Sequence, residues 1–114
     1  MRKQIDIDIR KRIKEYIEIV EFLKKVGGNE ELKVTQEYIF ITRKRLEHLM
    51  QQFGNYDIPR SKLQIWKKLH WIEAPPNRLT NQIRVGEKRV QRVKIDRKIA
   101  EELIELGGKD YKEV

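Results

Sequence analysis

The stretch of sequence that decides the fold runs from residue 57 to residue 98 and reads DIPRSKLQIWKKLHWIEAPPNRLTNQIRVGEKRVQRVKIDRK. It opens with Asp57-Ile58-Pro59, and proline is favoured in the first turn of a helix, where its missing N–H leaves no hydrogen bond unmade. Leu63, Trp66 and Leu69 then recur every three residues. This spacing predicts a short helix with one apolar stripe.

The same stretch contains the net charge of the whole protein. It holds twelve basic and four acidic residues, a net charge of +8, which equals that of the full 114-residue chain. The rest of the chain has fourteen residues of each sign and is neutral. A positive charge confined to about a third of the chain indicates a face that binds a polyanion, rather than charge spread for solubility.

Two strands are expected after the helix. Gln82–Val85 and Lys88–Ile95 alternate around Gly86-Glu87, and a glycine at the first turn position suits a type II′ hairpin. The alternation slips between Val90 and Val93, which we interpret as a bulge or as the twisting free end of a hairpin. Pro75-Pro76 interrupts any strand in the break at residues 73–81.

The flanking segments predict further elements. Apolar residues spaced by three and four indicate an amphipathic helix over Asp8–Val26, with Asp8 as N-cap and Gly27-Gly28 as its end. A loop over Asn29–Lys33 and a strand over Val34–Ile41 follow. Thr42 is expected to cap a helix over Arg43–Phe53, which Gly54-Asn55 closes. Asp96 is expected to cap a last helix that runs through Leu106 and ends at Gly107-Gly108.

The predicted fold class is therefore α+β, mostly α, as a single domain over residues 1–114. Its parts are an N-terminal helix and loop (1–33), a central unit (34–95) and a C-terminal helix and tail (96–114). Trp66 and Trp71 flank the apolar stripe of the short helix, so we expect both to pack in the core. Tyr16, Phe22 and Tyr38 are also expected in the core.

Several classes of function find no support in the sequence. The absence of cysteine excludes disulfides and cysteine-based zinc sites. His48 and His70 lack metal-ligand spacing, and neither glycine pair has a phosphate-binding pattern. We therefore expect no enzyme, no catalytic residue, no cofactor and no metal. With no apolar run of membrane-spanning length, we expect a soluble cytoplasmic protein.

The predicted order of elements, α-β-α-α-β-β-α, resembles the winged helix-turn-helix family of nucleic-acid-binding domains. The resemblance covers about residues 8–95. It rests on Ile39-Phe40-Ile41-Thr42 leading into Arg43–Phe53, on the turn at residues 54–57, and on Ile58–Leu63 opening the next helix. Leu69-His70-Trp71-Ile72-Glu73 is similar to the exit of that helix in the family, with His70 where glycine is usual.

The resemblance implies that Pro59–Leu69 is a recognition helix that enters the major groove of DNA. The residues of this helix implied to contact DNA are Arg60, Ser61, Lys62, Gln64, Lys67 and Lys68. Arg60, Ser61 and Gln64 would reach base edges, and Lys67 and Lys68 would meet phosphate. The hairpin would be a wing that contacts DNA through Arg84, Lys88, Arg89, Arg92 and Lys94. Thr42 and Arg43, at a helix N-terminus, would add contacts to the DNA backbone.

The expected function is thus sequence-specific binding of double-stranded DNA, as a transcriptional regulator or as a replication or partition factor of a mobile element. The protein would act as a homodimer that pairs through Asp8–Val26, Asp96–Leu106 or both. One alternative is a winged-helix module that docks onto a protein partner in a larger nucleic-acid-processing assembly. Another is RNA binding through the hairpin.

Overall fold

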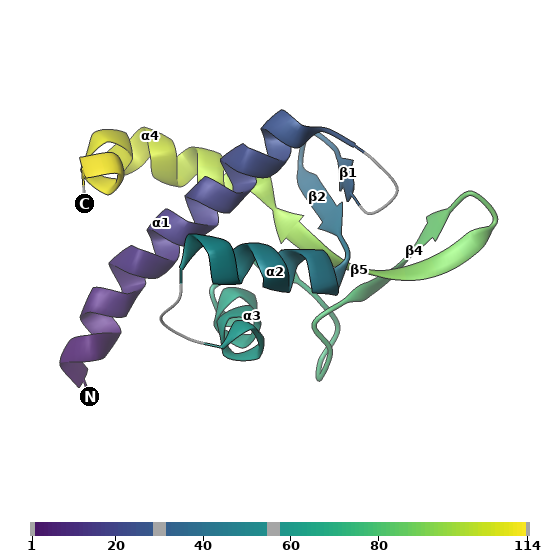
Figure 1. Ribbon diagram of the computed structural model, residues 1–114, viewed down its shortest axis with the longest axis horizontal. Coiled ribbons are helices and arrows are strands. Elements are labelled where there is room, and N and C mark those ends of the chain that lie inside the picture. The colour runs from purple at the N-terminus through teal and green to yellow at the C-terminus, as the bar shows by residue number, and fades with distance from the viewer. Residues whose placement is uncertain (1, 29–31, 55–57, 114) are drawn as a thin grey trace.

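The computed structural model describes residues 2–28, 32–54 and 58–113, with side-chain surroundings for those between 9 and 106. The described residues form four helices and an antiparallel sheet in an α+β, mostly helical arrangement (Figure 1). The elements in chain order are α1 (Arg2–Val26), β1 (Leu32–Val34), β2 (Tyr38–Ile41), α2 (Arg43–Phe53), α3 (Pro59–Lys68), β3 (Ile72–Glu73), β4 (Asn81–Val85), β5 (Lys88–Asp96) and α4 (Arg97–Glu113).

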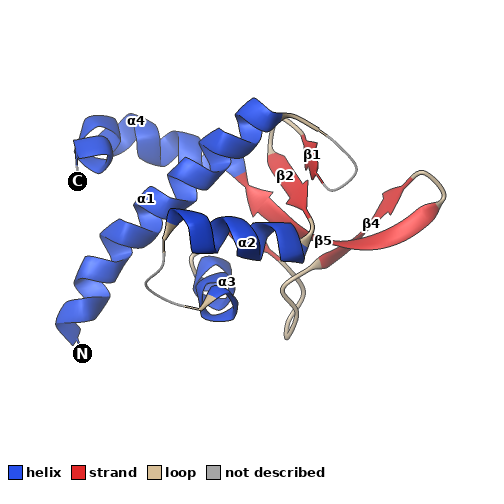
Figure 2. Ribbon diagram, viewed as in Figure 1, coloured by secondary structure: helices blue, strands red, loops and turns tan. Residues whose placement is uncertain are grey.

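The strand β5 organises the sheet. Its C-terminal half lies between β2 and β3, with Ile95 paired to Ile39 on one side and to Ile72 on the other. Its N-terminal half pairs with β4 alone, and this β4–β5 hairpin projects away from the helices (Figure 2). One nine-residue strand therefore connects the core of the molecule to an extended arm.

The helices cover one face of the sheet, where alternate side chains of the strands are buried. The buried strand residues are Leu32, Ile39, Ile41, Ile72, Val93 and Ile95. Tyr16 of α1 stacks on Trp71 with ring centroids 4.5 Å apart and meets the edge of Trp66 at 5.2 Å. These aromatic pairs join α1, α3 and the start of β3, and they confirm the prediction that both tryptophans belong to the core.

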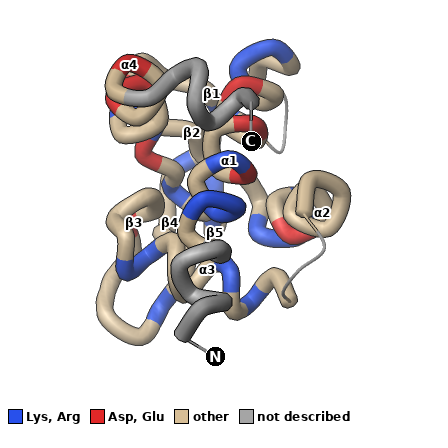
Figure 3. Tube along the Cα trace, turned by 90° about the vertical axis from the view of Figure 1, so that its left-hand side faces the viewer, with Lys and Arg blue, Asp and Glu red and all other residues tan. Residues whose placement is uncertain are grey.

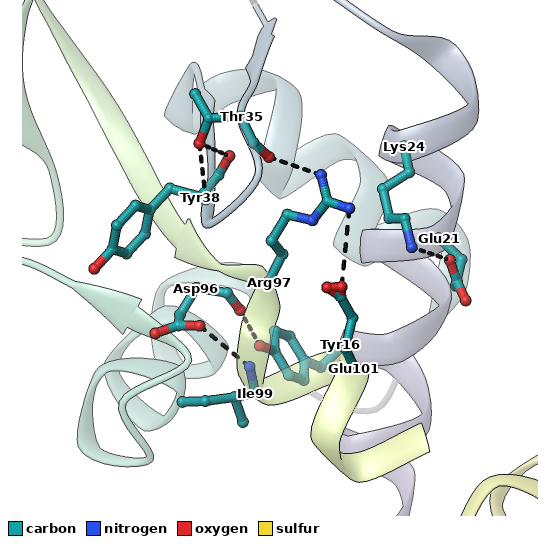
Figure 4. A network of polar contacts seen from close by, with 9 residues as sticks. All are labelled: Tyr16, Glu21, Lys24, Thr35, Tyr38, Asp96, Arg97, Ile99 and Glu101. Carbon is teal, nitrogen blue, oxygen red and sulfur yellow. Dashed lines mark hydrogen bonds and ion pairs between the residues drawn. The ribbon is translucent and has the colours of Figure 1, made fainter. Parts of the chain in front are cut away.

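A polar network fixes α4 to the end of β5 (Figure 4). Asp96 is the N-cap of α4 as predicted, since its Oδ1 accepts a hydrogen bond of 3.2 Å from the backbone N–H of Ile99. The Tyr16 hydroxyl donates to the backbone carbonyl of Asp96. Arg97 donates through Nη1 to the Thr35 carbonyl at 2.7 Å, so the network also reaches the turn between β1 and β2.

Several expected boundaries are wrong. The residues expected to form one strand over Val34–Ile41 form parts of two, since Thr35 Oγ1 and the Tyr38 backbone exchange hydrogen bonds of 2.9 Å and turn the chain. Leu32 and Lys33, expected in a loop, belong to β1. Helix α1 begins at Arg2, so Asp8 lies within it, and α4 continues through Gly107-Gly108. Asn55 and Asp57 lie outside the described residues. Asp57 and Ile58 were the two residues expected near the N-terminal cap of the third helix, and Ile58 is the N-cap of α3.

The β4–β5 hairpin has the predicted two-residue turn. Gly86 has a φ of +65°, a conformation that glycine adopts without a steric cost. Asn81–Val85 pairs with Lys88–Arg92 without interruption, so this pairing contains no bulge. The slip in the hydrophobic pattern arises because Ile83 and Val90 lie on one face of the ribbon, whereas Val93 and Ile95 face the core. The free-end interpretation is the correct one.

Two aromatic side chains expected in the core lie at its margin. Phe22 is 37% exposed and meets the edge of Phe53, and Tyr38 is half-buried on the sheet face opposite the helices.

Within the residues that the structure describes, none of the helices combines the length and the apolar composition that a membrane crossing requires.

Candidate nucleic-acid interface

An open groove lies between α3 and the base of the β4–β5 hairpin. The residues that line this groove, which we call the α3 groove, are Arg43, Arg60, Gln64, Lys67, Lys68, Asn77, Arg78, Leu79, Thr80 and Gln91. Five of them are basic and none is acidic. In the backbone view that looks along the molecule, Lys and Arg positions gather around α3 and β5, and acidic positions are prominent on α4 (Figure 3). A groove with this lining attracts anions.

Helix α3 presents its polar side chains to the groove because its other face is anchored in the core. Leu63 and Trp66 are completely buried, whereas Arg60, Gln64 and Lys68 are exposed. Ser61 is half-buried. The structure therefore brings Arg60, Gln64, Lys67 and Lys68 together on one surface, as the sequence predicted, and leaves Ser61 at its margin.

Lys62 corrects one prediction. Its side chain is 0% exposed, and its ammonium donates to Glu15 Oε2 at 2.7 Å, to the Met50 carbonyl at 2.8 Å and to the Gly54 carbonyl. Glu15 is itself buried on α1. Lys62 is therefore a buried ion-pair partner that ties α3 to α1 and to the end of α2, and it has no access to DNA.

Lys67 has a second role in the groove. Its ammonium donates to the carbonyls of Pro75 at 2.6 Å and of Arg78 at 2.8 Å. The loop at residues 74–80, which we call the 74–80 loop, is thereby fastened to α3 and forms one side of the groove. The sequence pattern predicted Lys67 as a phosphate ligand, and the structure shows its charge engaged by backbone dipoles.

The hairpin residues divide between two faces. Strand pairing places Arg84 opposite Arg89 and Gln82 opposite Gln91, on the face that Val93 and Ile95 continue toward the helices. Lys88, Arg92 and Lys94 alternate with them and lie on the outer face. The five predicted wing residues therefore do not form one surface, and Gln91 is the β5 residue that lines the α3 groove.

A second groove lies on the outer side, between the β1–β2 hairpin and the tip of the β4–β5 hairpin. Its lining includes Phe40, Ile83, Val85 and the basic residues Lys33, Arg84 and Arg92. Arg84 borders this outer groove as well, although strand pairing places it on the helix-side face. Arg92 lines the outer groove and does not line the α3 groove. The outer groove is more apolar in its lining than the α3 groove.

Lys94 is held within the sheet. Its ammonium lies 3.5 Å from Glu73 Oε1 and 4.1 Å from the centroid of the Tyr38 ring. Tyr38 also forms a side-chain hydrogen bond with Glu73. This hydrogen bond is the main cause that raises the pKa of Tyr38 to about 12, and desolvation is a smaller cause. Lys94 is therefore a partner of Glu73 and Tyr38, and its assignment to a DNA-contacting wing is corrected.

The N-terminus of α2 lies at the edge of the α3 groove. Thr42 is its N-cap, and its hydroxyl accepts from the Arg45 backbone N–H at 3.3 Å. Arg43 lines the groove and pairs through Nε with Glu47 Oε2 at 2.9 Å. Thr42 thus has a structural role as the cap, and Arg43 is the member of this pair that reaches the candidate site.

The sequence-based site omitted Asn77, Arg78, Thr80 and Gln91. Asn77 and Arg78 lie in the break between the two predicted strand segments, where pattern reasoning expected a connection only. The Pro75-Pro76-Asn77 sequence was a signal of a rigid turn, and Asn77 adopts a φ of +64°. Lys67 contacts this turn through hydrogen bonds to the Pro75 and Arg78 carbonyls, and no local pattern reveals that contact.

The described part of the chain contains no group of three or more His, Asp or Glu side chains placed to hold a metal ion. No family model matches the chain, and no curated protein matches its sequence. The α3 groove offers cationic and amide side chains. Guanidinium and ammonium groups can bind phosphate, and exposed arginine and amide side chains can pair with base edges.

Proposed function

We propose that this protein is a winged helix-turn-helix domain that binds double-stranded DNA in a sequence-specific manner. The single observation that supports the proposal best is the α3 groove, where the exposed face of α3, the start of α2 and the 74–80 loop together present five basic residues and no acidic one. In this assignment α2 and α3 are the helix pair, α3 is the recognition helix, and the β4–β5 hairpin is the wing.

The N-terminal half of α3 would enter the major groove. Arg60 and Gln64 are exposed one helical turn apart, and their side chains suit bidentate contacts to guanine and adenine, respectively. Lys68 and Arg43 would meet phosphates on either side. Phosphate contacts would supply affinity and position, and the two base contacts would supply sequence preference.

The wing would add positive charge beside the duplex. Arg89 is exposed on the face of the hairpin that continues toward α3, and Arg84 lies opposite it. Because the hairpin extends beyond the core, these residues are placed to follow the DNA backbone away from the recognition helix. This arrangement favours duplex DNA over a compact protein surface as the partner.

We further propose that the protein acts as a homodimer. Ile9 on α1 is 38% exposed and Leu106 on α4 is 85% exposed, so apolar surface is available on the two helices predicted to pair. A dimer would place two recognition helices about 34 Å apart on an inverted repeat. Sedimentation and the symmetry of a selected binding site test this part of the proposal separately from DNA binding.

Recognition by α3 is tested with a DNA site selected from a random duplex library by the unmodified protein. Arg60→Ala and Gln64→Ala should each abolish preference at one base-pair position, which costs about 1–3 kcal/mol of discrimination. Lys11→Ala, an exposed change on α1, is the matched control and should leave the preference intact. If both α3 variants keep the affinity and the sequence preference of the unmodified protein, α3 is not the recognition helix.

A further inference from the structure

The 74–80 loop is an excursion at the base of the wing, between β3 and β4, two strands that both pair with β5. Glu73 pairs with Lys94 and Asn81 pairs with Arg92, so seven residues on one strand lie opposite the single residue Val93 on β5. Asn81 Nδ2 donates to the Glu73 carbonyl and closes the base of the excursion. Thr80 Oγ1 donates to Gln91 Oε1 at 3.0 Å and fastens the returning chain to β5.

A hydrogen bond within the loop also fixes the conformation of its tip. The Arg78 N–H donates to the Pro75 carbonyl at 3.1 Å, and Asn77 takes the left-handed conformation that this turn needs. Lys67 then joins the Pro75 and Arg78 carbonyls from α3. The two prolines restrict the backbone further. The loop is therefore preorganised against α3 before any ligand binds, which lowers the entropic cost of binding.

The exposed residues of this loop have a distinctive chemistry. Pro75, Pro76, Asn77 and Arg78 are all exposed, and Asn77 and Arg78 line the α3 groove. Proteins that bind the minor groove read its A·T pairs with arginine and amide side chains, and they often insert apolar residues such as proline. Arginine in particular is attracted to the narrow, strongly negative minor groove of A·T tracts.

We propose that the 74–80 loop is a second DNA-reading element, in which Arg78 and Asn77 read A·T pairs in the minor groove next to the major-groove site of α3. The inference rests on the proposed function, because the loop and α3 line one groove and would meet one duplex. It assigns to Lys67 the role of a positioning residue that acts through the loop. The wing tip at Gly86 takes no part in it.

The proposal is tested with three versions of the selected site whose flanks contain A·T, G·C or inosine·C pairs. Inosine·C resembles G·C in the major groove but lacks the guanine 2-amino group, so it resembles A·T in the minor groove. The unmodified protein should bind the A·T and inosine·C flanks equally, and the G·C flank about tenfold more weakly. Equal loss on inosine·C and G·C flanks would show major-groove reading and overturn the proposal.

Arg78→Ala assigns the flank preference to the loop. The residue is exposed, so the variant should fold normally, and it should bind all three flanks with the same, reduced affinity. A uniform loss that preserves the tenfold difference would make Arg78 a phosphate contact and overturn the proposal. If the unmodified protein fails to bind any duplex, the proposed function fails as well, whereas normal binding without flank preference removes only this inference.

Lys67→Met and Lys68→Met separate positioning from direct contact. Lys67→Met should lose the flank preference. Because Lys67 acts through the loop, the double variant Lys67→Met/Arg78→Ala should bind all flanks with the same affinity as Arg78→Ala alone. Lys68→Met, the neighbouring exposed lysine, should weaken binding to all flanks equally. If Lys67→Met behaves as Lys68→Met does, the role assigned to Lys67 is wrong.

Discussion

Lys62 shows how one buried charge holds the two helices of the proposed DNA-binding unit in place. Its ammonium is satisfied by a carboxylate of α1 and by two carbonyls at the end of α2. Buried lysines are tolerated only when such partners offset the loss of hydration. On a helical pattern Lys62 resembled its exposed neighbours, and its partner Glu15 lies 47 positions away in sequence, so local reasoning had no means of finding the pair.

Lys62→Ala should lower the free energy of unfolding by about 3–5 kcal/mol, because it leaves Glu15 buried without its ammonium partner. Urea denaturation followed by circular dichroism measures the change. Lys68→Ala, on the exposed face of the same helix, is the control and should change stability by less than about 0.5 kcal/mol. Similar values for the two variants would contradict the buried ion pair.

His70 occupies a position that favours glycine. It has a φ of +65°, its N–H donates to the Lys67 carbonyl at 3.1 Å, and the Trp71 N–H donates to the Trp66 carbonyl at 2.9 Å. These are the two hydrogen bonds of a Schellman motif, in which the residue after the C-cap is left-handed. The expected resemblance to winged-helix domains already marked His70 as a departure from glycine, and the left-handed conformation found here is one that glycine adopts without a steric cost.

His70→Gly should stabilise the protein by about 1 kcal/mol, since a side chain in the left-handed region costs roughly 1–2 kcal/mol and glycine loses part of this gain to greater freedom in the unfolded chain. Thermal unfolding checks the sign. His48→Gly, at an exposed position inside α2, should instead destabilise by about 1 kcal/mol. A lower melting temperature for His70→Gly would refute the assignment of strain.

Because of Tyr16, the free energy of unfolding should fall as the pH rises into the alkaline range. Burial is the main cause that raises its pKa far above the usual value of 10.0, with the charge of Asp96 as a smaller cause. Above pH 10 the unfolded chain releases this proton and the folded protein keeps it, so unfolding becomes easier as pH rises, by about 1.4 kcal/mol per pH unit. Denaturation between pH 10 and 12 should approach this slope, and Tyr16→Phe should reduce it. An unchanged slope in the variant would be the contrary result.

At the scale of elements, short-range patterns predicted helices better than strands. The cores of α1, α2 and α3 follow from apolar spacing, and the two-residue turn of the β4–β5 hairpin follows from Gly86-Glu87. The β1–β2 turn was missed because Thr35 forms it within a run that otherwise favours strand. The continuous strand over Lys88–Ile95 was predicted and is confirmed as β5. Which of its apolar residues are buried depends on the neighbouring strands, so the pattern within the strand did not show it.

Thr42 tests whether α2 needs its cap for stability or for DNA. Thr42→Ala should cost about 1 kcal/mol of stability because the Arg45 N–H loses its side-chain acceptor, and Thr42→Ser should restore it. Denaturant unfolding gives both values. We expect the affinity of Thr42→Ala for a selected duplex to match that of the unmodified protein under conditions where both are folded; a large loss of affinity would assign the hydroxyl to DNA contact.

At the scale of the whole molecule, the sequence predicted where the basic surface lies and which helix belongs to it. It did not predict which residues make up that surface. Arg60, Gln64 and Lys68 meet in one groove as expected, while Lys62 turns inward and Lys94 pairs with Glu73. Arg78 and Gln91 replace them because the 74–80 loop and the strand pairing bring them beside α3. Charge counting identifies a region, and only the packing of distant segments decides which of its charges face a ligand.

The most direct test of the central claim is fluorescence anisotropy of the unmodified protein on a random-sequence duplex across a series of salt concentrations. The α3 groove and the wing should neutralise about six phosphates, which predicts a slope of roughly −5 in a plot of log K against log salt. Binding with this steep dependence supports a DNA-binding face. Absence of binding at low salt, or an affinity that salt leaves unchanged, would contradict it.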